Sequence, residues 1–417
     1  MQYNLPYGKT SQTITIPNDY SVEYISGKQH KKIPFFNNLA DEAFHYPLQS
    51  ATLPDLVRSG DSVVIVVDDH TRPCPSKQLL PIVLDELKKG GVSDSDITIL
   101  IGTGTHSSPT KNQIVQLLGK QIVHNYTIIS NDNKNSSYVS IGSSSYDHDI
   151  KIHKTYIDAD VKIVISDIEY HYFAGYGGTR KSILPGIASG ETIQQNHAMM
   201  FNEYATTGEL RKNPISIEMQ EAFDLAGCDF MIGAVLNQNH EIIGLWTGDA
   251  KQVMDHGVNL VDSLFTKKIS KKPDVIITAA DGSPHDINLY QALKAVHTAS
   301  KVINEDGIIL LAAECAEGMG NKVYQEWLKT YSTAEQIKQA LQKQFIIGAH
   351  KAYYHRKIIE RNTVYLSSCF NPSFVKKNLG FIPVENLEDS FYKLVSLKRD
   401  INNVLIVPKG STTRLVF

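Results

Sequence analysis

Two clusters of polar residues could bind an anion and move a proton. Residues 68–75 read DDHTRPCP, and in this cluster the guanidinium of Arg72 can hold a carboxylate or phosphate through two hydrogen bonds. Residues 102–106 read GTGTH, where small residues let the backbone approach a ligand and His106 can act as an acid or base near neutral pH. Either cluster alone also fits a structural role, as a capped turn or a hydrogen-bonded histidine.

A glycine-rich segment carries a third set of reactive side chains. Residues 169–186 read EYHYFAGYGGTRKSILPG and include His171 and Lys181. The phosphate-binding loop of ATPases and kinases requires glycine directly before the lysine, where this chain has Arg180, and Pro185 discourages the helix that follows such a loop. The segment therefore favours a lysine in a tight glycine turn, acting as a point charge or as an amine nucleophile, over a nucleotide hydrolase.

A metal ligand and a carboxylate clamp are the remaining candidates. His197 follows Lys181 by 16 residues, and neutral imidazole is a common metal ligand, although a lone histidine also fits a structural role. Gln291 and Lys294 are three residues apart and share one face of a predicted helix, where an amide beside a cation suits a small carboxylate. An ordinary solvated helix face is the alternative interpretation of that pair.

Seven short runs rich in β-branched residues predict the buried parallel strands that position these side chains. The runs cover residues 62–67, 97–101, 161–165, 275–279, 308–312, 363–366 and 403–407. Leu80, Val83, Leu84 and Leu87 have helical spacing, and Gly90 stops that helix. Strands alternating with helices predict an α/β fold, in which ligands bind beyond the carboxyl ends of parallel strands.

Length and composition narrow the class of protein. The 417 residues predict two domains, because a domain averages about 150 residues. A net charge of −3 argues against a nucleic-acid partner, and the lack of a long apolar run predicts a cytoplasmic protein with no membrane partner. The four cysteines form no Cys-x-x-Cys pair, so histidine or carboxylate must hold any metal.

The lysine-rich stretch TKKISKKP at residues 266–273 marks the expected domain boundary. We expect an N-terminal α/β domain at residues 1–270 and a C-terminal α/β domain at residues 271–417, both with mainly parallel sheets. The active site is expected in the cleft between them. Residues 130–145, which are rich in serine, asparagine and aspartate, predict a surface loop.

Six dispersed motifs stand in order along the chain. They are DHTRP at 69–73, TGTH at 103–106, HYFAG at 171–175, RKSILPG at 180–186, NH at 196–197 and YQALK at 290–294. In order and spacing they resemble the nickel-dependent lactate racemase family, and the resemblance covers nearly the whole chain. It implies a racemase or epimerase that inverts C2 of a 2-hydroxy acid, which is lactate or a larger or more polar analogue.

The resemblance also implies a cofactor and a role for each matched residue. The family's cofactor is the nickel pincer nucleotide, a pyridinium-3,5-bisthiocarboxylate mononucleotide that holds Ni(II). By resemblance, Lys181 is joined covalently to this cofactor and His197 ligates the nickel. His106 and His171 are the paired acid and base. Further cofactor contacts fall on Asp69, His70, Thr71, Arg72 and Tyr290, and substrate contacts on Arg72, Gln291 and Lys294.

The implied reaction moves a hydride instead of the α-proton. Removing the α-proton leaves a carbanion beside a carboxylate, whereas hydride transfer from C2 to the pyridinium leaves a neutral keto group. One histidine takes the hydroxyl proton, and the other serves the opposite enantiomer. By resemblance, His350 stands where lactate-specific members carry tryptophan, which implies a more polar substrate. The enzymes that build the cofactor are the implied protein partners.

Two other classes of protein remain open from the residues themselves. A protein of the same fold could bind a hydroxy acid or a nucleotide without catalysis. An NAD-dependent dehydrogenase is disfavoured, because no G-x-G-x-x-G follows the first predicted strand.

Overall fold

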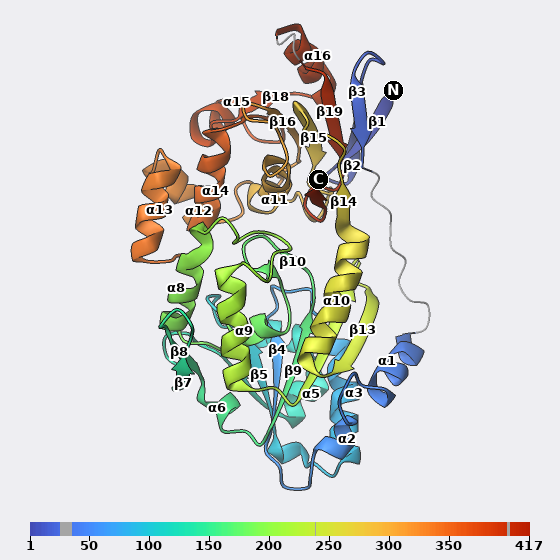
Figure 1. The fold of residues 1–417 in the computed structure, drawn as a ribbon, viewed down its shortest axis with the longest axis vertical. Coiled ribbons are helices and arrows are strands. Elements are labelled where there is room, and N and C mark those ends of the chain that lie inside the picture. Colours follow the sequence, from blue (N-terminus) through green and yellow to red (C-terminus); the bar gives the residue numbers. More distant parts are fainter. Residues whose placement is uncertain (26–35, 238, 398–400) are drawn as a thin grey trace. The chain divides into compact units, whose positions relative to one another are not determined.

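The computed structural model describes residues 1–25, 36–237, 239–397 and 401–417. They form two compact units, each with a six-stranded sheet (Figure 1). The small unit combines residues 1–25 with the residues described between 265 and 417, and the large unit comprises the residues described between 36 and 264. The predicted α/β fold is confirmed in both units.

The strands of the large unit are β4 (Val63–Asp68), β5 (Ile97–Gly102), β6 (Thr127–Ser130), β7 (Tyr138–Ser143), β8 (Asp149–His153), β9 (Val161–Asp167), β10 (Tyr170–His171), β11 (Gly175–Tyr176), β12 (Phe230–Leu236) and β13 (Ile242–Gly248). Its helices are α1 (Phe36–His45), α2 (Leu53–Leu56), α3 (Ser76–Lys89), α4 (Lys111–Leu118), α5 (Lys120–Asn125), α6 (Lys154–Ile157), α7 (Arg180–Ile183), α8 (Gly190–Ala198), α9 (Pro214–Ala226) and α10 (Ala250–Phe265).

The sheet of the large unit has the order β13-β12-β9-β4-β5-β6, and its strands are parallel except for β13, which is antiparallel to β12. In β4, Val63, Ile65 and Val67 pack with the buried leucines of α3 on one face. Val64 and Val66, which point to the other face, are also buried. Both faces of the strand are therefore covered, as the continuous apolar run predicts.

Helix α3 follows β4, and the spacing of its apolar residues explains why it covers one face of the sheet. Leu80, Val83, Leu84 and Leu87 lie buried at the predicted helical spacing. The helix begins after Pro75 and ends at Gly90. The predicted helix and its stop are confirmed, and the loop before the helix places residues 69–75 beyond the carboxyl end of β4.

The strands of the small unit are β1 (Gln2–Tyr7), β2 (Thr10–Thr15), β3 (Ser21–Tyr24), β14 (Thr266–Lys268), β15 (Val275–Ala279), β16 (Ile308–Ala312), β17 (Thr363–Ser367), β18 (Ile382–Val384), β19 (Asn403–Val407) and β20 (Arg414–Val416). Its helices are α11 (Leu289–Ser300), α12 (Lys322–Thr330), α13 (Ala334–Lys343), α14 (Ala349–Ile359), α15 (Pro372–Phe374) and α16 (Leu387–Leu397).

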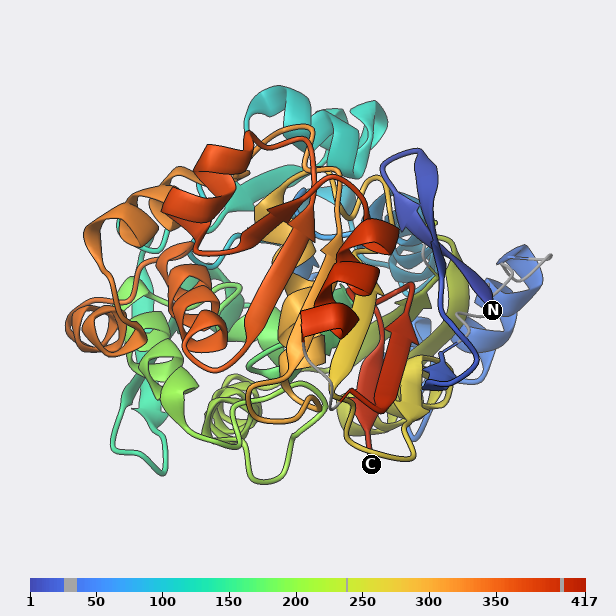
Figure 2. The same ribbon diagram turned by 90° about the horizontal axis from the view of Figure 1, so that it is seen from above.

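The sheet of the small unit has the order β18-β17-β16-β15-β19-β3 and is parallel throughout. Its edge strand β3 comes from the N-terminal segment, where Val22 pairs with Val404 of β19; the blue and red strands lie side by side in Figure 2. The first 25 residues therefore belong to the small unit, which differs from the expected domain of residues 1–270. This pairing joins distant parts of the chain, so no local sequence pattern predicts it.

All seven predicted strands are present, as β4, β5, β9, β15, β16, β17 and β19. Residues 130–145, expected as a loop, instead contain β7, which pairs with β8 in a hairpin. Among the described residues, no helix is both long enough and apolar enough to cross a membrane.

Candidate active site

The carboxyl ends of β4 and β5 bring Asp69 and His106 together. Asp68, the last residue of β4, pairs with Gly102, the last residue of β5, so the loops that follow begin side by side. The Nδ1 atom of His106 lies 2.7 Å from Oδ2 of Asp69. Asp69 is only 1% exposed. The two polar clusters found in the sequence therefore form one acid–histidine pair.

The other oxygen of Asp69 is held by Thr71. The Thr71 hydroxyl donates to Oδ1 at 2.6 Å and its backbone N–H donates at 3.1 Å. Burial alone raises the pKa of Asp69, but the hydrogen bonds from His106 and Thr71 outweigh burial and lower the pKa. Asp69 is therefore a charged acceptor. It keeps the ring proton of His106 on Nδ1, which makes Nε2 the proton-accepting nitrogen.

Close backbone packing joins the loop of His106 to the segment that carries Lys181. The Gly104 N–H donates to the carbonyl of Gly186 at 2.9 Å. A Cβ atom at Gly102 would lie 3.3 Å from the backbone of Gly186, which is tighter than ordinary contact. Glycine at 102 therefore permits this approach, as the small residues of the motif predict.

Lys181 lies in a group of half-buried charges around Asp68. The Ser182 hydroxyl donates to Oδ1 of Asp68 at 3.0 Å. Burial raises the pKa of Asp68 to about 6, although Lys181 and Arg72 act against this shift. Burial and the charge of Arg72 lower the pKa of Lys181 to about 8. The lysine therefore reaches its neutral, nucleophilic form more easily than an exposed lysine does.

Arg72 stays charged in the same group. Burial lowers its pKa, but the carboxylates of Glu169, Asp68 and Asp167 raise it further than burial lowers it. Asp167, the last residue of β9, has a pKa raised well above the ordinary value by burial and by Glu169 and Asp68. Ligand atoms of Asp68, Asp167 and Cys74 all lie within 4.8 Å of one another. Sequence reasoning missed Asp167, which ends β9 just as Asp68 ends β4.

His171 sits in a small hairpin of β10 and β11 and is surrounded by rings. Its Nδ1 accepts a hydrogen bond from the Ala174 N–H at 3.1 Å, so in the neutral ring the proton is on Nε2. The centroid of its ring is 4.6 Å from that of Phe173, which in turn lies 5.2 Å from the His197 ring. His106 and His171 therefore differ, since Nε2 accepts in the first and donates in the second.

His197 is a neutral, buried imidazole on α8. It is 4% exposed, and burial together with the charge of Lys181 lowers its pKa to about 3. Its Nδ1 lies 3.2 Å from Oδ1 of Asn196. Because an amide oxygen only accepts, Nδ1 carries the proton and Nε2 carries the lone pair that a metal needs.

The small unit holds the other predicted residues. Tyr290, Gln291 and Lys294 lie on α11, where the Gln291 N–H donates to the Asn288 side chain, which caps the helix. The Nζ atom of Lys351, a residue that sequence reasoning did not single out, lies 5.4 Å from the ring centre of Tyr290. Burial and the charge of Lys294 lower the pKa of Lys351 to about 7.

Two further predicted residues have distinct surroundings. The ring of His350, on α14, is buried, with its centroid 6.4 Å from that of Tyr290, so it is not a surface residue of the helix. His70 is exposed, and its cofactor contact stays a prediction. The expected position of the active site between the domains also stays a prediction.

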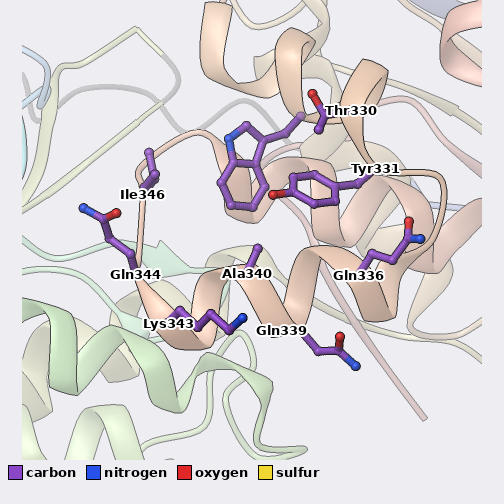
Figure 3. A pocket seen from close by; sticks show the side chains of 9 residues that line it. Thr330, Tyr331, Gln336, Gln339, Ala340, Lys343, Gln344 and Ile346 are labelled. Atoms are coloured by element: carbon purple, nitrogen blue, oxygen red, sulfur yellow. The ribbon is translucent and has the colours of Figure 1, made fainter.

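A separate hollow of about 690 Å³ lies on the small unit between α12 and α13 (Figure 3). Trp327, Tyr331, Gln339 and Lys343 are among the residues that line it. None of the residues predicted from the sequence lines this hollow.

Both α/β units carry ionisable side chains, and in the large unit several of them lie beyond the carboxyl ends of parallel strands, where such folds commonly bind ligands. Residues 7–208 match the lactate racemase N-terminal domain, and residues 268–414 match the lactate racemase C-terminal domain. Curated lactate racemases of Thermoanaerobacterium thermosaccharolyticum and Lactiplantibacillus plantarum are each 30% identical to the chain, over 97% and 98% of both partners respectively. The chain belongs to the lactate racemase family and is an isomerase.

Solved structures agree with this assignment. The lactate racemase apoprotein of T. thermosaccharolyticum has a TM-score of 0.89 at 28% identity and is covered over its whole length, as is this chain. A protein of Thermotoga maritima has a TM-score of 0.62 at 17% identity, over 87% of this chain and 96% of that one. The second likeness shows the fold alone.

Proposed function

We propose that this enzyme inverts C2 of a 2-hydroxy acid, which is lactate or a more polar analogue, with His106 and His171 as the acid–base pair. The observation that carries the proposal is the different protonation of the two Nε2 atoms. Asp69 makes Nε2 of His106 an acceptor, while the Ala174 N–H makes Nε2 of His171 a donor. Racemisation needs one nitrogen that accepts a proton and one that carries a proton, because a proton leaves the hydroxyl of one enantiomer and a proton returns to form the other. His171 gives up the Nε2 proton as an imidazolium, which carries a second proton on Nδ1 in place of the bond from Ala174, and solvent returns a proton from His106 to His171 between turnovers.

The nickel pincer nucleotide fits the residues of the large unit. His197 is neutral and uses Nδ1 toward Asn196, which suits Nε2 as a nickel ligand. Lys181 has the lowered pKa of an amine that can bond covalently to a thiocarboxyl arm. Asp69, His70, Thr71 and Arg72 of the large unit are proposed as further contacts, as is Tyr290 of the small unit. When bound, the nucleotide supplies a pyridinium ring that takes up and returns a hydride.

The chain's own residues then bind substrate and move protons. Nε2 of His106 takes the hydroxyl proton, and the buried charge of Asp69 stabilises the imidazolium that forms. Arg72, Gln291 and Lys294 hold the carboxylate throughout, which keeps the keto acid bound while it turns its other face. For the opposite enantiomer His171 takes the proton, and this requires Nδ1 to give up its bond from Ala174.

Lys351 supports the more polar analogues among the substrates. The Nζ atom of Lys351 lies 5.4 Å from the ring centre of Tyr290, which is one helical turn from Lys294 on α11, and an anionic group bound there would favour the charged form of Lys351, whose pKa burial lowers to about 7. A second carboxylate on the substrate would find a partner there. The enzymes that build the nickel cofactor are the proposed protein partners.

The test incubates protein from cells that make the cofactor with single enantiomers of lactate, malate and 2-hydroxyglutarate, and with gluconate. Chiral chromatography measures the opposite enantiomer or the C2 epimer. Interconversion of at least one acid, with about one nickel per chain, supports the proposal. Nickel-loaded protein that binds these acids and interconverts none contradicts it.

A further inference from the structure

The side chain of Asn196 is held in one orientation. Its Nδ2 donates to Oε2 of Glu218 at 2.9 Å and to the carbonyl of Ile215 at 3.2 Å. Both groups only accept, so the NH2 end of the amide must face them. The amide oxygen is thereby turned toward Nδ1 of His197, 3.2 Å away.

This orientation decides which nitrogen of His197 carries the proton. An amide oxygen beside Nδ1 requires N–H there and leaves the lone pair on Nε2. A reversed amide would place NH2 beside Nδ1, and the proton would move to Nε2. A histidine protonated on Nε2 cannot ligate a metal through that atom.

Glu218 is itself fixed by a second element. Glu218 is fully buried on α9, and its Oε1 accepts from the Ser144 hydroxyl at 2.7 Å and lies 2.6 Å from Nδ1 of His148. Ser144 and His148 belong to the turn between β7 and β8, in which the His148 N–H donates back to the Ser144 hydroxyl at 3.4 Å. Both carboxylate oxygens of Glu218 are therefore engaged, one by the hairpin and one by Asn196.

We propose that Glu218 is a positioning residue that sets the tautomer of His197 through Asn196, with the β7–β8 hairpin holding Glu218 in place. The chain of contacts runs from Ser144 and His148 through Glu218 and Asn196 to His197. The hairpin thus acts on the site although none of its residues belongs to the six motifs. The inference rests on the proposed function only in treating His197 as the nickel ligand.

Glu218→Gln is the sharpest variant. A glutamine has one accepting oxygen, and the two donors of the hairpin hold it at the Oε1 position. Its NH2 then opposes Nδ2 of Asn196, so of the two acceptors of that group only the Ile215 carbonyl is left, and the reversed amide gains population relative to the parent. Asn196→Asp added to this variant restores a donor–acceptor match, because an aspartate accepts both from Gln and from Nδ1 of His197. Glu221→Gln is the matched control. Glu221 also lies on α9, and it accepts a hydrogen bond at 2.9 Å from the N–H of Ser145, which belongs to the same hairpin turn as Ser144.

The primary measurement is ¹⁵N NMR of histidine-labelled protein made without nickel or cofactor, with the His197 signals assigned by their loss in His197→Ala. We expect Nδ1–H in the parent and in Glu221→Gln, a shift toward Nε2–H in Glu218→Gln, and recovery in the double variant. An Nε2–H tautomer in the parent overturns the proposal even if no variant folds. An unchanged tautomer in folded Glu218→Gln also overturns it.

Nickel retention gives the second readout. Partners that orient a metal-binding histidine contribute about 10–100-fold in metal affinity, so we expect Glu218→Gln to lose nickel on dialysis at least tenfold faster than Glu221→Gln. Equal retention in the two variants contradicts the proposal. Parent protein that shows the expected tautomer but never carries nickel instead refutes the proposed function and leaves the positioning role intact.

Discussion

Asp69→Asn tests whether His106 is a base. In the parent, Oδ1 of Asp69 accepts two hydrogen bonds from Thr71, at 2.6 and 3.1 Å, and Oδ2 accepts from Nδ1 of His106 at 2.7 Å. Asparagine has one accepting oxygen, and the two Thr71 donors hold it at the Oδ1 position. Its NH2 then faces Nδ1, which must accept, so the ring proton moves to Nε2. His106 can no longer take the hydroxyl proton.

The expected loss of activity follows from two contributions, a hydrogen bond to a charged group and general base catalysis. A hydrogen bond to a charged group contributes about 1.5–3 kcal/mol, which alone slows the reaction by about 10–150-fold. Loss of general base catalysis costs about 10²–10⁴-fold. Because the same tautomer change causes both losses, the terms overlap, and we expect kcat to fall by about 10²–10⁴-fold. This range corresponds to about 3–5 kcal/mol in the activation barrier.

The assay measures initial rates from each enantiomer by chiral chromatography, normalised to nickel per chain, because Asp69 is also a proposed cofactor contact. Both directions must lose the same factor in kcat/KM, since the equilibrium constant of a racemisation is one. Asp132→Asn is the control: Asp132 also accepts backbone N–H groups, from Lys134 at 3.1 Å and Asn135 at 3.3 Å, in an exposed turn. Activity within threefold of the parent, at equal nickel content, would refute the assignment of His106.

Three further variants test other parts of the structure. Lys181→Arg keeps a charge but loses the nucleophilic amine, so peptide mass spectrometry should find no added mass at residue 181; an added mass there excludes attachment through Lys181. Lys294→Met should raise KM for lactate by about 10–150-fold with a smaller change in kcat, because a charged hydrogen bond to the carboxylate is lost; an unchanged KM removes Lys294 from the substrate site. Burial lowers the pKa of His355 from 6.5 to about 4, so the unfolded chain binds the extra proton and the parent should lose about 3 kcal/mol of stability relative to His355→Gln as the pH falls from 6.5 to 4. Urea unfolding of both proteins measures this difference, and parallel stability curves would contradict the assigned pKa.

Local patterns predict much of the fold and fail where pairing is distant. The run at 62–67 and the helical spacing of Leu80 to Leu87 are complete within a few residues, and both elements form as predicted. The pairing of Val22 with Val404 depends on which edge of the sheet is free, and the sequence of neither strand indicates its partner. Residues 130–145 are expected as a loop because Ser, Asn and Asp crowd them, yet β7 lies within this stretch and contains Tyr138, Val139 and Ile141, whose residue types favour a strand.

The site shows the same division between local and tertiary information. Residues that follow a strand can be found from the sequence, and Asp167 could have been found by that rule because it ends β9. Glu218 could not, since nothing near it in the sequence resembles a site. Its relation to His197 exists only through the contact of its carboxylate with Asn196.

Asp68 and Asp69 show most directly what the sequence leaves open. They are adjacent and chemically identical, yet burial raises the pKa of Asp68 to about 6, while hydrogen bonds from His106 and Thr71 overcome burial and lower the pKa of Asp69. The two pKa values shift in opposite directions because successive side chains at the end of a strand point to opposite sides. One meets Ser182 and the charge of Lys181, and the other meets His106. One dipeptide thus supplies a carboxylate that is held charged beside His106 and a half-buried carboxyl group whose pKa is raised despite a neighbouring lysine.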